Sequence, residues 1–128
     1  MCAKLKTSEE PLVSVVDDDV SVRRSMLRLI QSFGFGAEAF ESAEDFLGFG
    51  RVEQTACLIL DVRMPRMDGL KLQRRLAEDR AAIPIVFLTA RASDEEEHRA
   101  LQAGAVAFLR KPVSKDALRR ALHAVLGR

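Results

Sequence analysis

The segment CLILDVRMPRMDG, residues 57–69, largely decides which fold the sequence predicts. Four apolar residues are followed directly by the carboxylate of Asp61, and the chain then turns through Pro65 and Gly69. A short apolar run bounded by turn residues is typical of a strand that is buried on both faces of a sheet. The segment therefore predicts a central strand that carries one ionisable group at its carboxyl end.

Four further apolar runs of strand length alternate with helix-like stretches. Parallel strands need helical crossovers, so strict alternation predicts an α/β fold in which helices cover both faces of a parallel sheet. We expect a single three-layer, doubly wound, five-stranded parallel sheet with strand order 2-1-3-4-5. The predicted strands are residues 12–16, 36–40, 57–60, 84–88 and 105–109, with 36–40 at an edge.

Length and composition indicate one globular domain. The chain has 128 residues, of which 48% are apolar and 30% charged, and its net charge is +1. The balanced charge gives no reason to expect nucleic-acid binding, and no run reaches the roughly 18 apolar residues of a membrane span. Cys2 and Cys57 lie far apart, which favours a reducing, cytoplasmic location. We expect residues 1–10 to form a flexible tail and residues 11–128 the domain.

Polar side chains follow four of the five predicted strands. Asp17 and Asp18 end the first, Asp61 the third, Thr89 the fourth and Lys111 the fifth. The carboxyl ends of parallel strands share one edge of the sheet, and sites in open α/β sheets form there, where the strand order reverses. With strands one and three as neighbours, the three carboxylates are predicted to meet in one crevice.

Three neighbouring carboxylates repel one another and are stabilised by a cation. Mg²⁺ takes one or two carboxylates together with phosphate oxygens and waters, and Mn²⁺ suits similar oxygen ligands. Lys111 adds a positive charge and Thr89 a hydroxyl, so the set forms a receptor for a phosphoryl group. Asp61 is predicted to be the nucleophile that forms an acyl phosphate. Asp19 is predicted to cap the first helix rather than to bind the ion.

Four motifs occur in order along the chain: VVDDD, LDVRMPRMDG, FLTA and FLRKP. With them the sequence resembles the CheY-like receiver domains of two-component response regulators over residues 12–127. The resemblance implies a flavodoxin-like fold and a phosphorylation-controlled switch rather than an enzyme. It implies that Asp61 accepts the phosphoryl group from a sensor histidine kinase or a phosphotransfer protein.

The resemblance also assigns roles to the other residues. Asp18 is implied to bind Mg²⁺ directly, Asp17 to act mainly through metal-bound water, and Arg63 to offer its backbone carbonyl to the metal. Lys111 is implied to bind the phosphoryl group and to precede a cis bond to Pro112. The domain is implied to assist only its own phosphotransfer and dephosphorylation.

Thr89 and Phe108 are the switch residues that the resemblance implies. Thr89 is expected to move toward the phosphoryl group and Phe108 to rotate inward. These movements change the face formed by the helix after Ser93, strand 105–109 and the helix after Ser114. That face is expected to regulate a downstream protein or an output domain, or to form a homodimer.

The segment RMPRMDG, residues 63–69, and Phe108 most resemble regulators of the nitrogen-fixation type. In those regulators an output domain follows the receiver, and here the last predicted helix ends near residue 128. We expect either a stand-alone receiver or an excised one. Arg63 and Arg91 lie two residues after Asp61 and Thr89, where they flank the route of hydrolytic water, and they predict an altered phosphoryl lifetime of undetermined sign.

Two alternative functions remain open from the sequence. DDDVS, residues 17–21, also resembles the first motif of haloacid-dehalogenase-type phosphatases, with Asp17 as the nucleophile. Against it, Asp61 would have no role, and only Asp116 is available for the late acidic motif. The second alternative is a receiver that acts as a scaffold independently of phosphorylation.

Overall fold

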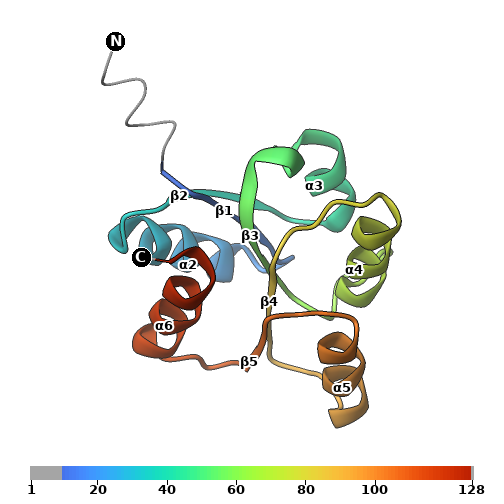
Figure 1. Cartoon of the computed structure of the whole chain (residues 1–128). Helices are drawn as coiled ribbons and strands as arrows, with labels where there is room; N and C mark the ends of the chain where they lie inside the picture. The colour runs from blue at the N-terminus through green and yellow to red at the C-terminus, as the bar shows by residue number, and fades with distance from the viewer. Residues whose placement is uncertain (1–9, 128) are drawn as a thin grey trace.

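The computed structural model describes residues 10–127 (Figure 1), so all but the last residue of the predicted flexible tail lies outside the described residues. Five parallel strands form one sheet in the order β2-β1-β3-β4-β5, which confirms the predicted topology. The strands are β1 (Leu12–Val16), β2 (Gly36–Phe40), β3 (Thr55–Leu60), β4 (Ile85–Thr89) and β5 (Ala107–Arg110).

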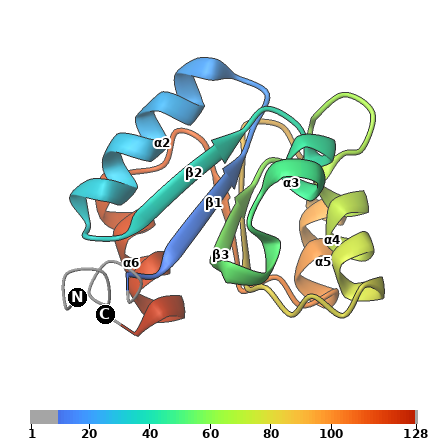
Figure 2. The ribbon, with the colours of Figure 1, turned by 90° about the horizontal axis from the view of Figure 1, so that it is seen from above.

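Helices cover both faces of the sheet (Figures 1 and 2). One face carries α2 and α6, and the other carries α3, α4 and α5. Within residues 10–127 no helix is long and apolar enough to span a membrane. The helices are α2 (Val20–Ser32), α3 (Ala43–Phe49), α4 (Gly69–Glu78), α5 (Asp94–Gln102) and α6 (Lys115–Leu126), and a short 3-10 helix, η1 (Val52–Gln54), precedes β3.

The alternation of side chains along the strands divides the core in two. On β3, Cys57 and Ile59 point toward α2 and α6, whereas Leu58 and Leu60 point toward α3, α4 and α5. All four are at most 2% exposed. Burial of one large apolar side chain stabilises a fold by about 1.5–3 kcal/mol, so this strand is a main source of stability.

Three strands differ from their predicted bounds. β4 spans Ile85–Thr89 rather than residues 84–88, and β5 ends at Arg110 rather than at residue 109. β3 begins at Thr55, before the apolar run, because Thr55 is buried and its Oγ1 lies 2.8 Å from Oγ of Ser14 on β1. β5 begins at Ala107 rather than at residue 105. The N–H of Ala105 cannot pair with β4, because it donates to the carbonyl of Ala100 at the end of α5 (3.0 Å).

Side-chain caps fix where the helices begin. Asp19 caps α2, as predicted, by accepting the N–H groups of the first turn. Ser93 and Glu96 form a complete capping box at α5, whereas at α3 the side chain of Ser42 accepts the N–H of Asp45. Aspartate is one methylene shorter than the glutamate that normally completes the box.

The hydrogen-bond ladder continues for one residue past the strand ends and holds the polar residues in register. The N–H of Asp17 donates to the last carbonyl of β2 (3.1 Å), and the N–H of Asp61 to the last carbonyl of β1 (3.1 Å). The N–H of Lys111 donates to the carbonyl of Thr89 at the end of β4 (2.8 Å). The sheet itself therefore sets the positions of these backbones.

Candidate functional site

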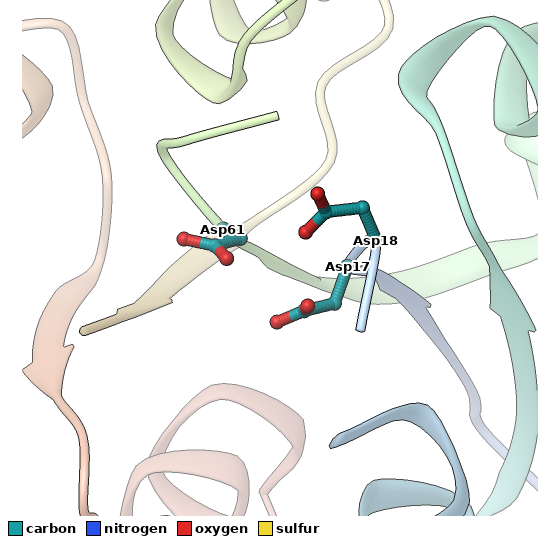
Figure 3. Close-up of side chains that lie close together, drawn as sticks. All are labelled: Asp17, Asp18 and Asp61. Atoms are coloured by element: carbon teal, nitrogen blue, oxygen red, sulfur yellow. The ribbon is translucent and has the colours of Figure 1, made fainter. Parts of the chain in front are cut away.

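Three carboxylates converge at the carboxyl edge of the sheet (Figure 3). Asp17 and Asp18 follow β1, and Asp61 follows β3, the neighbouring strand. Each offers an oxygen atom, and these atoms lie within 4.8 Å of one another. Asp17 and Asp61 are buried, whereas Asp18 is exposed and faces solvent. The structure thus brings together the acidic residues that the strand order predicted to meet.

Lys111 is the cation beside this cluster. Its Nζ lies 2.8 Å from Oδ2 of Asp17 and 3.6 Å from Oδ2 of Asp61. Burial alone would lower the pKa of Lys111, but the hydrogen bond and charge of Asp17, together with the charge of Asp61, raise this pKa above its ordinary value. Lys111 therefore stays protonated at neutral pH. The Lys111–Pro112 bond is cis.

Both oxygens of Asp17 are already engaged within the protein. Oδ2 accepts from Lys111, and Oδ1 accepts from the N–H of Asp19 at 2.9 Å. Asp17 is only 3% exposed. Because both oxygens are engaged, Asp17 is better suited to hold an ion indirectly than to bind it directly.

Asp61 lies in an environment that disfavours its charge. Burial raises the pKa of its carboxyl group, and the neighbouring charge of Asp17 raises it further. Thr89, Lys111 and the backbone N–H of Arg63 act in the opposite direction, and that N–H lies 3.3 Å from Oδ1 of Asp61. The net effect is a raised pKa, so the ionised carboxylate is in need of a cation.

Thr89 ends β4, and Phe108 lies on the neighbouring strand β5. Thr89 is fully buried, and its hydroxyl donates to the carbonyl of Arg91 (3.1 Å). Phe108 is half-buried, with its ring centroid 5.6 Å from that of Phe87. The guanidinium of Arg110 lies 5.4 Å from the centroid of the Phe108 ring, so a cation covers this aromatic side chain.

Arg63 does not lie free beside the cluster. Its Nη2 is 2.7 Å from Oε1 of Glu96 on α5, which directs the side chain toward that helix. Arg91 is exposed, and its N–H lies 3.3 Å from the Thr89 hydroxyl. The predicted effect of both arginines on phosphoryl lifetime stays a prediction.

The residues present fit a hard divalent cation. The cluster offers carboxylate oxygens, which Mg²⁺ prefers, and an open hollow of about 350 Å³ lies beside it. Cys57 is not part of the site, because it is buried in the core and burial raises the pKa of its thiol to about 12. The hollow is lined by Asp18, Arg63, Met64, Pro65 and Asp68.

Comparison with known families agrees with this geometry. The family model described as the response regulator receiver domain matches residues 13–123, which is most of the chain. The chain belongs to the response regulator receiver family. The receiver is thus a signalling domain of two-component systems, which is consistent with a non-enzymatic role, and phosphorylation and Mg²⁺ are typical of its family.

Bacterial regulators are among its relatives. Nodulation protein W of Bradyrhizobium diazoefficiens is 40% identical over 123 residues, which are 96% of this chain and 54% of the relative. Transcriptional regulatory protein FixJ of the same species is 36% identical over 106 residues, 83% of this chain and 52% of FixJ. The receiver therefore spans about half the length of these curated relatives.

A solved structure shares the fold as well as the sequence. The response regulator receiver protein from Burkholderia phymatum superimposes with a TM-score of 0.80 and is 42% identical. The match covers 92% of this chain and 96% of that chain. The doubly wound receiver fold is thus established by relatives of similar extent.

Sequence patterns did not reveal three contacts of this receiver. Glu96 pairs with Arg63, and Arg110 covers Phe108, although neither pairing has a local sequence signal. A Cβ added to Gly69 would lie 2.2 Å from the carbonyl oxygen of Asp61. The position of Gly69 just before a predicted helix could have suggested a close backbone approach.

Proposed function

We propose that Asp61 accepts a phosphoryl group from the phosphohistidine of a sensor histidine kinase or a phosphotransfer protein. A carboxylate oxygen of Asp61 attacks phosphorus, the O–P bond forms, and the N–P bond breaks with its electron pair returning to the imidazole. The observation that carries the proposal is the meeting of three carboxylates with Lys111, whose Nζ lies 3.6 Å from Oδ2 of Asp61.

The proposal includes a divalent ion, Mg²⁺ or Mn²⁺, held by Asp18 and Asp61, by Asp17 mainly through water, and by the backbone carbonyl of Arg63. When bound, the ion neutralises the charge that develops on the transferring phosphoryl oxygens. Lys111 contributes a fixed ammonium to the same oxygens. These residues assist transfer onto Asp61 and the later hydrolysis, and we propose no turnover of a separate substrate.

The proposed switch uses Thr89 and Phe108 within a domain of residues 11–128. Thr89 turns its hydroxyl from the carbonyl of Arg91 to the phosphoryl group, and Phe108 moves inward. The change alters the face formed by α5, β5 and α6, which regulates a downstream protein or an output domain. Phosphorylation acts only through the difference in its interactions with the two states.

The haloacid-dehalogenase alternative has less support. It requires Asp17 as the nucleophile, yet both oxygens of Asp17 are engaged, by Lys111 and by the N–H of Asp19. It also leaves Asp61 without a task, although Asp61 lies in the same cluster. The match to the receiver family model over residues 13–123 supports a receiver rather than a phosphatase.

Acetyl phosphate labelling tests the proposed function. We expect Mg²⁺-dependent formation of an acyl phosphate on the full chain, lost in EDTA. Asp18→Asn should reduce labelling at least about tenfold, because mutations around a metal site typically lower metal affinity or activity by about 10–100-fold. Intact-mass spectrometry measures the product.

The melting temperature of Asp18→Asn in EDTA shows whether a loss of labelling is caused by unfolding. Because Asp18 is exposed, its replacement should leave the melting temperature without metal unchanged. Absence of labelling in the correctly folded wild-type chain would contradict the proposed function. It would favour the scaffold that acts independently of phosphorylation.

A homodimer through α5, β5 and α6 stays a prediction, and several charges on this face are paired within the chain. On α6, Arg119 and Arg120 both pair with Asp116 of the same helix, and on β5 Arg110 pairs with Glu97 of α5. The charges are thus partly satisfied within one chain. Sedimentation with and without beryllofluoride and Mg²⁺ tests it, and an unchanged monomer over a wide concentration range would exclude it.

A further inference from the structure

One ion pair connects the loop after β3 with the first turn of α5. Arg63 Nη2 lies 2.7 Å from Glu96 Oε1, across 33 residues of sequence. The side chain of Arg63 is 54% exposed and that of Glu96 only 13%. The pair therefore joins a side chain that can reorient in solvent to one that is held in place.

Glu96 is also the residue that fixes the start of α5. The same oxygen, Oε1, accepts the N–H of Ser93 at 2.9 Å. In return, the N–H of Glu96 donates to Oγ of Ser93 at 3.1 Å. Arg63 thus contacts the carboxylate on which the capping box at the N-terminus of α5 depends.

A second arginine holds the same turn from the other side. Arg110 on β5 binds Glu97 (2.8 Å) and the carbonyl of Ala92 (2.8 Å). The two arginines have different neighbours, because Arg63 lies two residues after Asp61 and donates its backbone N–H to Oδ1 of Asp61 at 3.3 Å. Arg63 is therefore the one placed to respond to chemistry at Asp61.

We propose that a phosphoryl group on Asp61 competes with Glu96 for the guanidinium of Arg63, and that the loss of this ion pair loosens the first turn of α5. The inference rests on the proposed function, because it needs an anion bound at Asp61. A phosphoryl group carries more charge than one carboxylate and accepts the arginine fork bidentately. The pair that it replaces is partly exposed and weak, so the competition favours the phosphoryl group.

The competition has a consequence in both directions. If anion binding at Asp61 weakens the Arg63–Glu96 pair, then removing the charge of Glu96 must strengthen anion binding by the same factor. Exposed ion pairs are worth about 0.2–1 kcal/mol, which corresponds to about a 1.4- to 5-fold change in affinity. This reciprocity is measurable without knowledge of any partner protein.

The test is a double-mutant cycle on beryllofluoride binding in the presence of Mg²⁺. Glu96→Gln removes the charge but keeps a side chain that completes a capping box. We expect it to lower the half-saturating beryllofluoride concentration about 1.4- to 5-fold. Arg63→Gln should raise that concentration. In the Arg63→Gln background, Glu96→Gln should have no effect, because no guanidinium remains to be released.

Glu97→Gln is the matched control, since it makes the same change one residue further along α5. Glu97 faces Arg110 rather than Arg63, so beryllofluoride binding should be unchanged. Hydrogen exchange of amides 92–97 supplies a second measurement. Beryllofluoride should accelerate exchange of these amides in the wild type. In Glu96→Gln the amides should already exchange faster before beryllofluoride is added.

The outcomes separate this inference from the proposed function. Suppose that Asp61 is labelled normally with Mg²⁺, but Glu96→Gln still changes beryllofluoride binding in the Arg63→Gln background. The proposed competition is then wrong, whereas the proposed function stands. The same holds if Glu97→Gln changes binding as much as Glu96→Gln does. Failure of the wild type to accept either phosphoryl group or mimic overturns both proposals.

Discussion

Replacing Asp61 by asparagine is expected to abolish acyl phosphate formation, lowering labelling by acetyl phosphate at least about 100-fold, because an amide oxygen is a poor nucleophile. Asparagine has the same shape and keeps an oxygen that can accept the N–H of Arg63. The side chain can therefore occupy the same place in the cluster. Intact-mass spectrometry and peptide mapping measure the loss.

The same variant is expected to be more stable than the wild type at neutral pH without metal. Burial, and then the charge of Asp17, raise the pKa of Asp61, so its ionised form is disfavoured in the folded state. A raised pKa contributes stability at low pH that is lost as pH rises through the folded-state value. Asparagine avoids that loss. The stability gain should shrink as pH falls and Asp61 becomes protonated.

Urea unfolding in EDTA at several pH values measures the gain and shows that lost labelling is not caused by unfolding. Asp17→Asn provides the comparison between functions. If the protein is a receiver, the acyl phosphate that Asp17→Asn still forms lies on Asp61. If it is a phosphatase of the haloacid-dehalogenase type, Asp17→Asn forms no acyl phosphate, because Asp17 is the residue that would carry it. Full labelling of Asp61→Asn would contradict our assignment of the phosphoacceptor.

Gly69→Ala is expected to destabilise the fold by about 1–3 kcal/mol, the usual cost of overpacking. The added Cβ would lie 2.2 Å from the carbonyl oxygen of Asp61 and 3.1 Å from Cε1 of Phe87. Because the obstacle is backbone, it cannot turn away. The same displacement moves Asp61, so labelling should fall along with the free energy of unfolding, measured by urea denaturation.

Gly48→Ala is the matched control for that substitution. Gly48 lies inside α3, and a Cβ there meets nothing within 4 Å. Alanine in a helix interior is favoured over glycine by about 0.5–1 kcal/mol, so this variant should gain stability and keep full labelling. Equal stability of the two variants would show that the close approach at Gly69 is relieved at little cost.

The sheet was predictable because its signals are local. Each strand is a short apolar run, and the order of runs and helix-like stretches leaves few parallel topologies. The larger differences, at the starts of β3 and β5, depend on contacts that an apolar pattern does not encode. Thr55 extends β3 because a hydroxyl on β1 faces it, and Ala105 is withheld from β5 by the end of α5. Neither partner can be identified from spacing alone.

The site was predictable in its members but not in its contacts. The carboxyl ends of parallel strands share one edge, which places Asp17, Asp61 and Lys111 together. The preference of Lys111 for Asp17 over Asp61, at 2.8 Å against 3.6 Å, depends on side-chain geometry that the sequence does not specify. The pairing of Arg63 with Glu96 depends on how α5 is placed against the sheet.

The ladder contacts at the strand ends have a consequence for synthesis on the ribosome. Lys111 and Asp17 are separated by 94 residues, and the lysine is held in register by β4. A nascent chain that has emerged only as far as β4 already contains all three acidic residues, yet it lacks the ammonium that offsets their charge. If Asp61 is the phosphoacceptor, competence at this site therefore requires that nearly the whole receiver domain has emerged and paired.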